Sequence, residues 1–229
     1  PPLHIRRKPM LYRTDLAYIH HQGFSEFAES SAPFVVALLP RGARVVEMGC
    51  GSGILARKLT EAGFDVHGFD ASPAMIELAR ETAPNGRFEV ASFETAELPR
   101  CDAVVAMGEV LNYGDIRLFL PRAAHALQPG GLLLFDVAER GAYPAYDEVR
   151  VGGDDWSVIA IKESDGRTVT RRVLTFREQS RDEEVHTLHL YDRDELLALL
   201  RPDFRVKLRR TYGRRRLPKG HTAYVCNKR

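Results

Sequence analysis

The sequence has few cysteines, a single tryptophan and no long apolar segment. Its 229 residues include three cysteines, Cys50, Cys101 and Cys226, which are odd in number and widely spaced. Because no Cys-x-x-Cys pair and no Cys/His cluster occurs, the sequence indicates neither a disulfide framework nor a zinc site, and we expect no metal. No apolar run approaches about 18 residues, so we expect no membrane-spanning helix and no membrane partner. The N-terminus lacks the apolar core of a signal peptide, which makes the cytoplasm the expected location.

Internal repeats and low-complexity linkers are also absent, so the simplest organisation is one folding unit over residues 1–229. This length is normal for one α/β domain with additional segments. The formal net charge is only +2, yet residues 201–229 contain eleven Lys or Arg and a single acid, Asp203. This basic stretch could hold RNA phosphates, meet an acidic small substrate or simply be solvated, and the sequence leaves these alternatives open.

The most informative segment is residues 44–59, where two valines are followed by three glycines and then by apolar residues at helical spacing. The pattern predicts a buried strand, a tight loop and a helix. Gly49, Gly51 and Gly53 allow the backbone to turn sharply and to approach a ligand, because glycine has no Cβ. The unpaired N–H groups at the start of a helix suit a carboxylate or a phosphate. We therefore expect a ligand with a nucleoside end at this loop.

The spacing of the glycines distinguishes two classes of nucleotide site. In the dinucleotide fingerprint G-x-G-x-x-G, the third glycine would fall at Ile54. The chain instead has E-x-G-x-G-x-G from Glu47, and Asp70 follows 23 positions later at the end of a second expected strand. A carboxylate there can accept hydrogen bonds from ribose hydroxyls, although a solvated strand end is the alternative. The pattern resembles motif I and the following acidic position of the class I S-adenosylmethionine (SAM)-dependent methyltransferases.

The resemblance continues in order to about Val137 and includes the string LQPGGLLLFD. It implies an α/β fold with a Rossmann-like seven-stranded sheet, mostly parallel with an antiparallel last strand, and with helices on both faces. The matching segments are strands at 64–70, 87–91, 101–108 and 132–136, a helix at 115–127, a turn at 128–131, and closing antiparallel strands at 204–211 and 222–227.

The resemblance also implies a set of cofactor contacts. Met75 would lie against the adenine, just after a helix start at Ser72. Ser92 stands where the family commonly has an acid that accepts from the adenine amino group, which is a departure from the family pattern. The expected cofactor-binding residues are Tyr18, Glu47, Gly49, Cys50, Gly51, Gly53, Asp70, Ala71, Met75, Ser92, Phe93, Met107, Gly108 and Asn112.

Residues 1–32 are expected to form an N-terminal arm, with a break at residues 22–23 before a second helix over 25–39. In related methyltransferases such an arm folds over the cofactor, which would bring Tyr12, Tyr18, His20 and His21 to cofactor or substrate. An amphipathic helix with surface histidines is the alternative.

The loop after the fourth expected strand, residues 107–114, should face the ligand, because ligands lie beyond the carboxyl ends of strands in open α/β sheets. Glu109 could accept a proton or hold a cationic substrate, and Asn112 and Tyr113 could orient it. Alternatively, Asn112 bonds the turn backbone and Tyr113 packs under the arm.

Residues 151–191 are expected to be an inserted antiparallel sheet that covers the substrate as a small β lid, similar to the lids of small-molecule methyltransferases. We expect three strands, at 156–162, 168–178 and 184–191, with turns at 165–166 and 180–182. His186 and His189 alternate along the third strand, and a lone strand histidine is more often structural than catalytic.

The sequence therefore predicts a SAM-dependent methyltransferase acting on N, O or C of a small-molecule acceptor. The reaction is an in-line displacement that releases S-adenosylhomocysteine, for which the protein mainly aligns the reactants and excludes water. The candidate catalytic residues are Glu109, Tyr113, His20, His21 and His186. The alternatives are a nicotinamide-dependent oxidoreductase, a non-catalytic SAM- or nucleotide-binding module and, less favourably, an RNA methyltransferase. We expect a monomer or homodimer whose partner is the methyl acceptor, with nucleic acid an unlikely partner.

Overall fold

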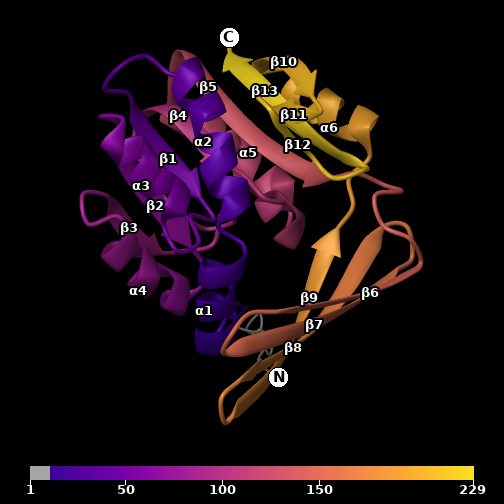
Figure 1. Ribbon diagram of the computed structural model, residues 1–229. Helices are drawn as coiled ribbons and strands as arrows, with labels where there is room; N and C mark the ends of the chain where they lie inside the picture. The colour runs from indigo at the N-terminus through magenta and orange to yellow at the C-terminus, as the bar shows by residue number, and fades with distance from the viewer. Residues whose placement is uncertain (1–10) are drawn as a thin grey trace, which may run out of the picture.

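A computed structural model describes residues 11–229, so the first ten residues of the expected arm lie outside the described residues. The chain forms an α/β fold with a second, smaller sheet (Figure 1). The elements are, in chain order, α1 (Thr14–Gly23), α2 (Glu26–Leu38), β1 (Arg44–Met48), α3 (Ile54–Glu61), β2 (Asp65–Asp70), α4 (Pro73–Thr82), β3 (Arg87–Val90), β4 (Cys101–Ala106), the 3-10 turn η1 (Val110–Tyr113), α5 (Ile116–Ala126), β5 (Leu127–Ala138), β6 (Tyr146–Gly152), β7 (Trp156–Ser164), β8 (Thr168–Arg177), β9 (Ser180–His189), α6 (Arg193–Leu200), β10 (Phe204–Arg209), β11 (Thr211–Tyr212), β12 (Arg215–Arg216) and β13 (His221–Lys228).

The main sheet has seven strands in the order β10-β13-β5-β4-β1-β2-β3. The pairs from β5 to β3 are parallel, whereas β13 runs antiparallel to both β5 and β10. This arrangement confirms the expected Rossmann-like sheet with one reversed strand. The order also brings the carboxyl ends of β4, β1, β2 and β3 to one edge of the sheet.

Helices cover both faces of this sheet, because successive strand residues point to opposite sides. Val45 packs in a core with α2, α3 and α4, and its neighbour Val46 packs in a second core with α5 and α6. Val104 and Val105 in β4 alternate between the same two cores. The near-continuous apolar sequence of β1 and β4 follows from this burial on two faces.

Strand β5 begins five residues earlier than the sequence indicates. The expected turn at 128–131 is the bulged first part of the strand, since pairing passes from Cys101↔Leu127 to Ala103↔Leu132 with a shift in register. Gly130 has a φ of 78°, a left-handed backbone conformation that is typical of a bulge and not of a regular strand interior. Strand β4, in turn, ends at Ala106, two residues before the expected end.

The second sheet has four strands in the order β6-β7-β8-β9, one more than expected. Strand β6 was not predicted because it is almost entirely solvent-exposed and mixes charged residues with valines, so it lacks the signature of a half-buried strand. The predicted turn at 180–182 was wrong, since Ser180 pairs with Arg177 and begins β9. The inserted sheet therefore spans 146–189, and Figure 1 shows it beyond the end of β5 and beside α1.

Candidate active site

The glycine loop joins β1 to α3, and all three of its glycines have positive φ angles. A Cβ at Gly49 would lie 2.4 Å from Val110 Cγ2, and one at Gly53 would lie 2.9 Å from the Cα of Ala79, so both glycines permit close packing. A Cβ at Gly51, whose φ is 52°, would meet no atom within 4 Å. Gly51 is therefore the point at which the loop backbone lies open to a ligand.

Glu47, at the carboxyl end of β1, is 4% exposed, and its Oε2 atom is buried without a hydrogen-bond partner. Burial, with a smaller contribution from the negative charge of Asp70, raises the pKa of this carboxyl group to about 8. A buried polar atom without a partner normally finds one in a ligand or water. The arrangement suits a cationic ligand group, consistent with the cofactor role expected for Glu47.

Asp70, at the end of β2, accepts hydrogen bonds from the backbone N–H of Gly51 at 3.0 Å and of Ser72 at 2.9 Å. Burial raises the pKa of Asp70, and the backbone hydrogen bonds partly counter that effect. Its carboxylate thus fastens the glycine loop to the loop after β2. The contact with ribose remains a prediction.

The other expected cofactor residues follow the ends of neighbouring strands, so the sheet brings them to the same edge. Ala71 is exposed in the loop after β2, Ser92 is half-buried after β3, and Met107 is half-buried after β4. The hydroxyl of Ser92 accepts from the N–H of Glu94 at 3.2 Å, and Gly108 donates its N–H to Asp136 at 2.8 Å. Cys50, Met75 and Phe93 are buried, with exposures of 5%, 2% and 7%.

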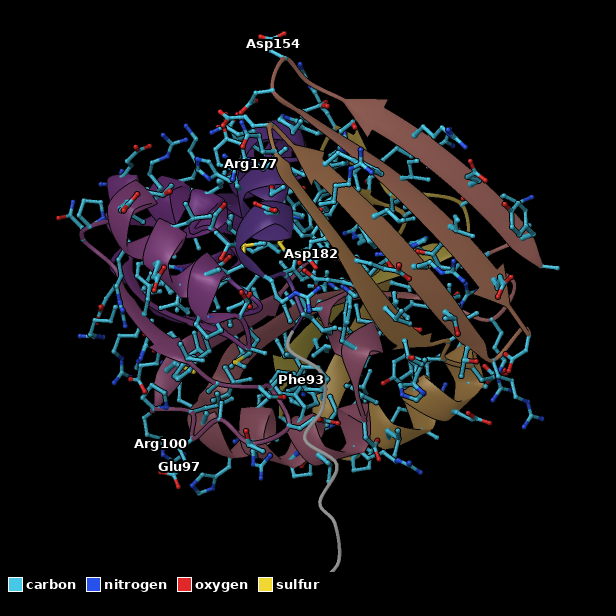
Figure 2. All side chains as sticks on the ribbon, turned by 90° about the horizontal axis from the view of Figure 1, so that it is seen from below. Phe93, Glu97, Arg100, Asp154, Arg177 and Asp182 are labelled. Atoms are coloured by element: carbon cyan, nitrogen blue, oxygen red, sulfur yellow. The ribbon has the colours of Figure 1, made fainter. Side chains whose placement is uncertain are left out.

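Two expected cofactor contacts are directed elsewhere. The amide of Asn112 is fully buried, donates to the carbonyls of Ala138 at 3.0 Å and His189 at 2.5 Å, and accepts from Ala138 N–H at 3.0 Å. The amide therefore bonds backbone groups of β5 and of the end of β9, and not the backbone of its own turn as in the alternative interpretation. The hydroxyl of Tyr18 donates to Asp155 at 3.0 Å, and its ring lies under the guanidinium of Arg177, at the β6–β9 sheet instead of the glycine loop. Figure 2 labels Arg177 at the end of this sheet.

The arm crosses the expected cofactor site at two points. The carbonyl of Tyr12 accepts from the Ser72 hydroxyl at 2.7 Å, and Nδ1 of His21 lies 2.9 Å from the hydroxyl of Ser52 in the glycine loop. His20 sits between the rings of Tyr12 and Phe24, and its Nδ1 is buried without a partner. Burial, with nearby positive charge, lowers the pKa of His20 to about 4, so the imidazole is neutral at neutral pH.

A polar cluster surrounds Glu109 beyond the end of β4. Its carboxylate accepts hydrogen bonds from the Tyr143 hydroxyl at 2.8 and 2.9 Å, lies 2.8 Å from His221 Nε2 and forms an ion pair with Arg171 at 3.3 Å. Burial alone would raise the pKa of Glu109, but the hydrogen bond from His221 and the charge of Arg171 outweigh it and lower the pKa to about 2. Glu109 is in the predicted place, but it is a fixed anion with little capacity to act as a base.

A second set of polar side chains in contact with one another connects η1, β9 and the arm. The hydroxyl of Tyr113 lies 3.3 Å from that of Tyr12 and 3.5 Å from Nδ1 of His186. Nε2 of His186 lies 3.0 Å from Glu184, and Arg171 donates to the Tyr113 hydroxyl at 3.3 Å. Arg171 contacts both Glu109 and Tyr113, and Tyr113 contacts His186, so three of the five expected catalytic residues lie in one cluster.

The sequence analysis did not identify several members of these clusters: Tyr143, Arg171, Glu184, His221, and also Asp136 with Tyr212. Asp136 lies two residues before the end of β5 and accepts from the N–H groups of Gly108 and Glu109 and from the Tyr212 hydroxyl. An acid at the carboxyl end of a central strand was an available signal. Arg171 and Glu184 carried no such signal, because they lie in strands whose facing was unknown.

Within residues 11–229, no group of three or more His, Cys, Asp or Glu residues is placed to hold a metal ion. Among the helices of the same residues, none combines the length and the apolar character needed to cross a membrane.

Comparison with known proteins gives a family match over the glycine-loop region. Residues 45–131 match the profile of a family described as a methyltransferase domain. A ubiquinone biosynthesis O-methyltransferase of Chelativorans sp. (strain BNC1) is 31% identical over 134 residues, covering 55% of this chain and 51% of that protein. A trans-aconitate 2-methyltransferase of Variovorax paradoxus (strain S110) is 34% identical over 118 residues, covering 49% of this chain and 45% of that protein. The chain thus spans about half the length of the curated relatives it matches.

Solved structures resemble nearly the whole chain at low sequence identity. The CcbJ methyltransferase from Streptomyces caelestis superposes with a TM-score of 0.81 at 19% identity, covering 97% of this chain and 99% of that one. The sugar N-methyltransferase KedS8 from Streptoalloteichus sp. ATCC 53650 gives 0.76 at 20% identity, covering 100% and 97%. An S-adenosylmethionine-dependent methyltransferase from Clostridium acetobutylicum ATCC 824 gives 0.79 at 15% identity, covering 93% and 97%. At these identities the likeness concerns the fold.

Proposed function

We propose that the protein transfers a methyl group from SAM to a small molecule, because residues 45–131 match the methyltransferase domain family. The observation that carries the proposal is the combination of an open backbone at Gly51 with the unpartnered carboxyl oxygen of Glu47. Glu47 suits the ammonium group of the amino-acid part of SAM, and Asp70 suits its ribose hydroxyls.

SAM supplies a methyl group on a positively charged sulfur, which is already a strong electrophile. The protein has to hold the acceptor in line with that methyl group and keep water away. The arm and the β6–β9 sheet are suited to this task, because Glu184 of β9 accepts hydrogen bonds from the backbone of Tyr12 at 2.6 Å and of Arg13 at 2.8 Å. We infer that this joined pair, the arm and the inserted sheet, covers the acceptor.

The other functions are less well supported by the same residues. In the dinucleotide fingerprint the third glycine packs a helix closely on the strand, and here Ile54 occupies that position and is buried. A nicotinamide-dependent oxidoreductase should show a rise in melting temperature with NAD(H) and none with SAM. A non-catalytic module should bind SAM but release no S-adenosylhomocysteine with any amine, phenol, alcohol or carboxylate.

A matched pair of glycine substitutions tests the proposed binding site. Gly51→Ala and Gly63→Ala both place a Cβ in open space at a positive φ, and Gly63 lies in the turn after α3. Both variants should lose about 1–2 kcal/mol of stability from the left-handed backbone. Gly51→Ala alone should weaken SAM binding in calorimetry, by about tenfold or more, which is about 1.4 kcal/mol.

Equal SAM affinities for the two variants would remove Gly51 from the binding site. Failure of the unsubstituted protein to bind either SAM or S-adenosylhomocysteine would overturn the proposed function itself.

A further inference from the structure

We propose that Tyr113, His186 and Glu184 form a proton relay that removes the proton from a hydroxyl group of the acceptor, so that the protein methylates oxygen. This inference rests on the proposed methyl transfer from SAM and names the class of acceptor. It also selects, among the candidate catalytic residues, the base that the geometry favours.

The inner end of the relay is fixed by Glu184. Its carboxylate accepts the backbone N–H groups of Tyr12 and Arg13, and it faces Nε2 of His186 at 3.0 Å. The side chains of Glu184 and His186 are only 2% and 1% exposed. A carboxylate that accepts from two backbone groups is an acceptor for the ring as well, so Nε2 of His186 carries the hydrogen. Nδ1 is then left with a free lone pair.

That free lone pair faces the Tyr113 hydroxyl at 3.5 Å. Arg171 can only donate, so the Tyr113 oxygen accepts from it and has its own proton available for Nδ1 of His186. Burial, the largest effect, raises the pKa of Tyr113, so the phenol keeps its proton at neutral pH. Tyr113 can therefore pass a proton on but does not serve as the final base.

The outer end of the relay lies toward the arm. The Tyr12 hydroxyl is 3.3 Å from the Tyr113 hydroxyl, and the Tyr12 carbonyl bonds Ser72 beside the proposed cofactor site. A hydroxyl group of the acceptor can take the position on the Tyr113 oxygen that the Tyr12 hydroxyl occupies here. Tyr12 therefore contacts both the Tyr113 hydroxyl of the relay and Ser72 beside the proposed cofactor site.

Three other candidates are less suitable as the base. Glu109, with a pKa of about 2, is held by His221, Arg171 and Tyr143. His20 has a pKa of about 4 and no carboxylate behind it, and His21 is bonded to Ser52 of the glycine loop. Around His186, the titratable or charged groups are Glu184 on its own strand, Arg171 on β8, Tyr113 in η1 and Tyr12 in the arm.

The acceptor oxygen forms a bond to the methyl carbon while the carbon–sulfur bond breaks and leaves its electron pair on sulfur. The acceptor's hydroxyl proton passes to the Tyr113 oxygen as the Tyr113 proton passes to Nδ1 of His186. The resulting imidazolium is stabilised by Glu184 and later returns its proton to water. A neutral amine needs no such relay, because its lone pair attacks while the proton is still attached.

The test compares His186→Asn and Tyr113→Phe with His189→Asn, a substitution on the exposed face of the same strand. Release of S-adenosylhomocysteine is measured with methyl glucoside and catechol as hydroxyl acceptors, and with cyclohexylamine and aniline as amine acceptors. We expect turnover of a hydroxyl compound. Its kcat should fall about 10²- to 10³-fold in the first two variants and less than about twofold in His189→Asn, the range that general-base catalysis covers.

The KM for SAM should stay within about threefold in all three variants. A second measurement needs no acceptor: nitrogen-15 spectra of histidine-labelled protein should show the Nε2–H tautomer for His186. Turnover of amines only, an unchanged kcat in His186→Asn, or the Nδ1–H tautomer would each overturn the relay. If SAM still binds in those cases, the proposed function stands without it.

Discussion

Three residues near the proposed site adopt local arrangements that reduce the stability of the folded protein. Glu47 buries a carboxyl group with one oxygen unbonded, and a buried polar group without a partner costs about 1–3 kcal/mol. Tyr12 and Glu109 adopt φ values of 52° and 62°, a left-handed backbone that costs an ordinary residue roughly 1–2 kcal/mol. Strained residues of this kind cluster at binding and catalytic sites. All three lie at the edge where the site is proposed.

Replacing Glu47 by Gln should stabilise the ligand-free protein at alkaline pH. The folded protein keeps the Glu47 proton up to a pKa of about 8, whereas an unfolded glutamate loses it near 4.5. Between these values the folded state binds more protons, so this group lowers stability as the pH rises. In urea unfolding, the wild type should lose about 4 kcal/mol of stability relative to Glu47→Gln between pH 5 and pH 8.5.

The control is Glu61→Gln, because the Glu61 side chain is 58% exposed at the end of α3. Its stability difference from the wild type should not change between the two pH values. SAM binding should weaken in Glu47→Gln alone. Parallel pH profiles for wild type and Glu47→Gln would show that the carboxyl group is not buried in its neutral form.

At the scale of elements, side chains rather than sheet pairing join the two sheets to η1. Asn112 bonds both backbone groups of Ala138 in β5 and the carbonyl of His189 in β9. The Tyr191 hydroxyl donates toward the carbonyls of Leu111 and Gly114, at 2.9 and 2.6 Å. The inserted sheet is therefore held at a defined position relative to Glu109 and Tyr113.

Asn112→Ala should destabilise the protein without removing a cofactor contact. The substitution removes three hydrogen bonds to backbone groups of β5 and β9, of which the Ala138 carbonyl keeps one other partner, the Tyr191 N–H at 3.4 Å. This should lower the free energy of unfolding by about 2–4 kcal/mol. Chemical denaturation measures this loss, and Asn227→Ala, at an exposed position of β13, should change it by less than about 0.5 kcal/mol. SAM affinity at low temperature should remain within about threefold of wild type, and a larger loss would return Asn112 to the cofactor site.

At the scale of the whole molecule, the excess of positive charge lies on the side of β10 and β13. Part of it is used internally: Arg215 pairs with Glu26 of α2 at 3.0 Å, and Lys228 donates to the carbonyl of Leu127 at 2.8 Å, just after α5. Tyr212 lies in the basic hairpin formed by β11 and β12. Its side chain is fully buried and donates a hydrogen bond to Asp136. It therefore offers no stacking surface for a base. Cations along β10, an edge strand, also discourage pairing with another chain.

We expect only weak, salt-sensitive binding of RNA. Without an exposed aromatic platform at the hairpin, phosphate contacts alone should give non-specific affinities, roughly 10⁻⁴–10⁻⁶ M at physiological salt. Fluorescence anisotropy with a labelled single-stranded RNA, titrated from low to physiological salt, checks this. Nanomolar binding that persists at physiological salt would favour a nucleic-acid substrate and revise the role of the basic stretch.

The parts of the site that were predictable from the sequence are those formed by consecutive residues. The glycine loop follows from residues 47–53, and Asp70 and Ser92 follow from the ends of recognisable strands. The Glu109 cluster was only partly predictable, because its partners are distant in the chain: Arg171 is 62 positions away and His221 is 112. Strand β6 was missed for a different reason, since a strand exposed along most of its length leaves little hydrophobic pattern.

The sequence by itself determined the order of the elements of the main sheet and the loop at which SAM is proposed to bind, because short-range patterns of apolar residues and glycines specify local structure. Tertiary structure alone decided which of several plausible polar residues meet. It assigned Asn112 to a joint between sheets and Tyr18 to the inserted sheet, and it placed His186 between Glu184 and Tyr113. Side-chain facing in the inserted strands depends on which side of the sheet is covered by the arm, and that is settled only when segments far apart in the chain pack together.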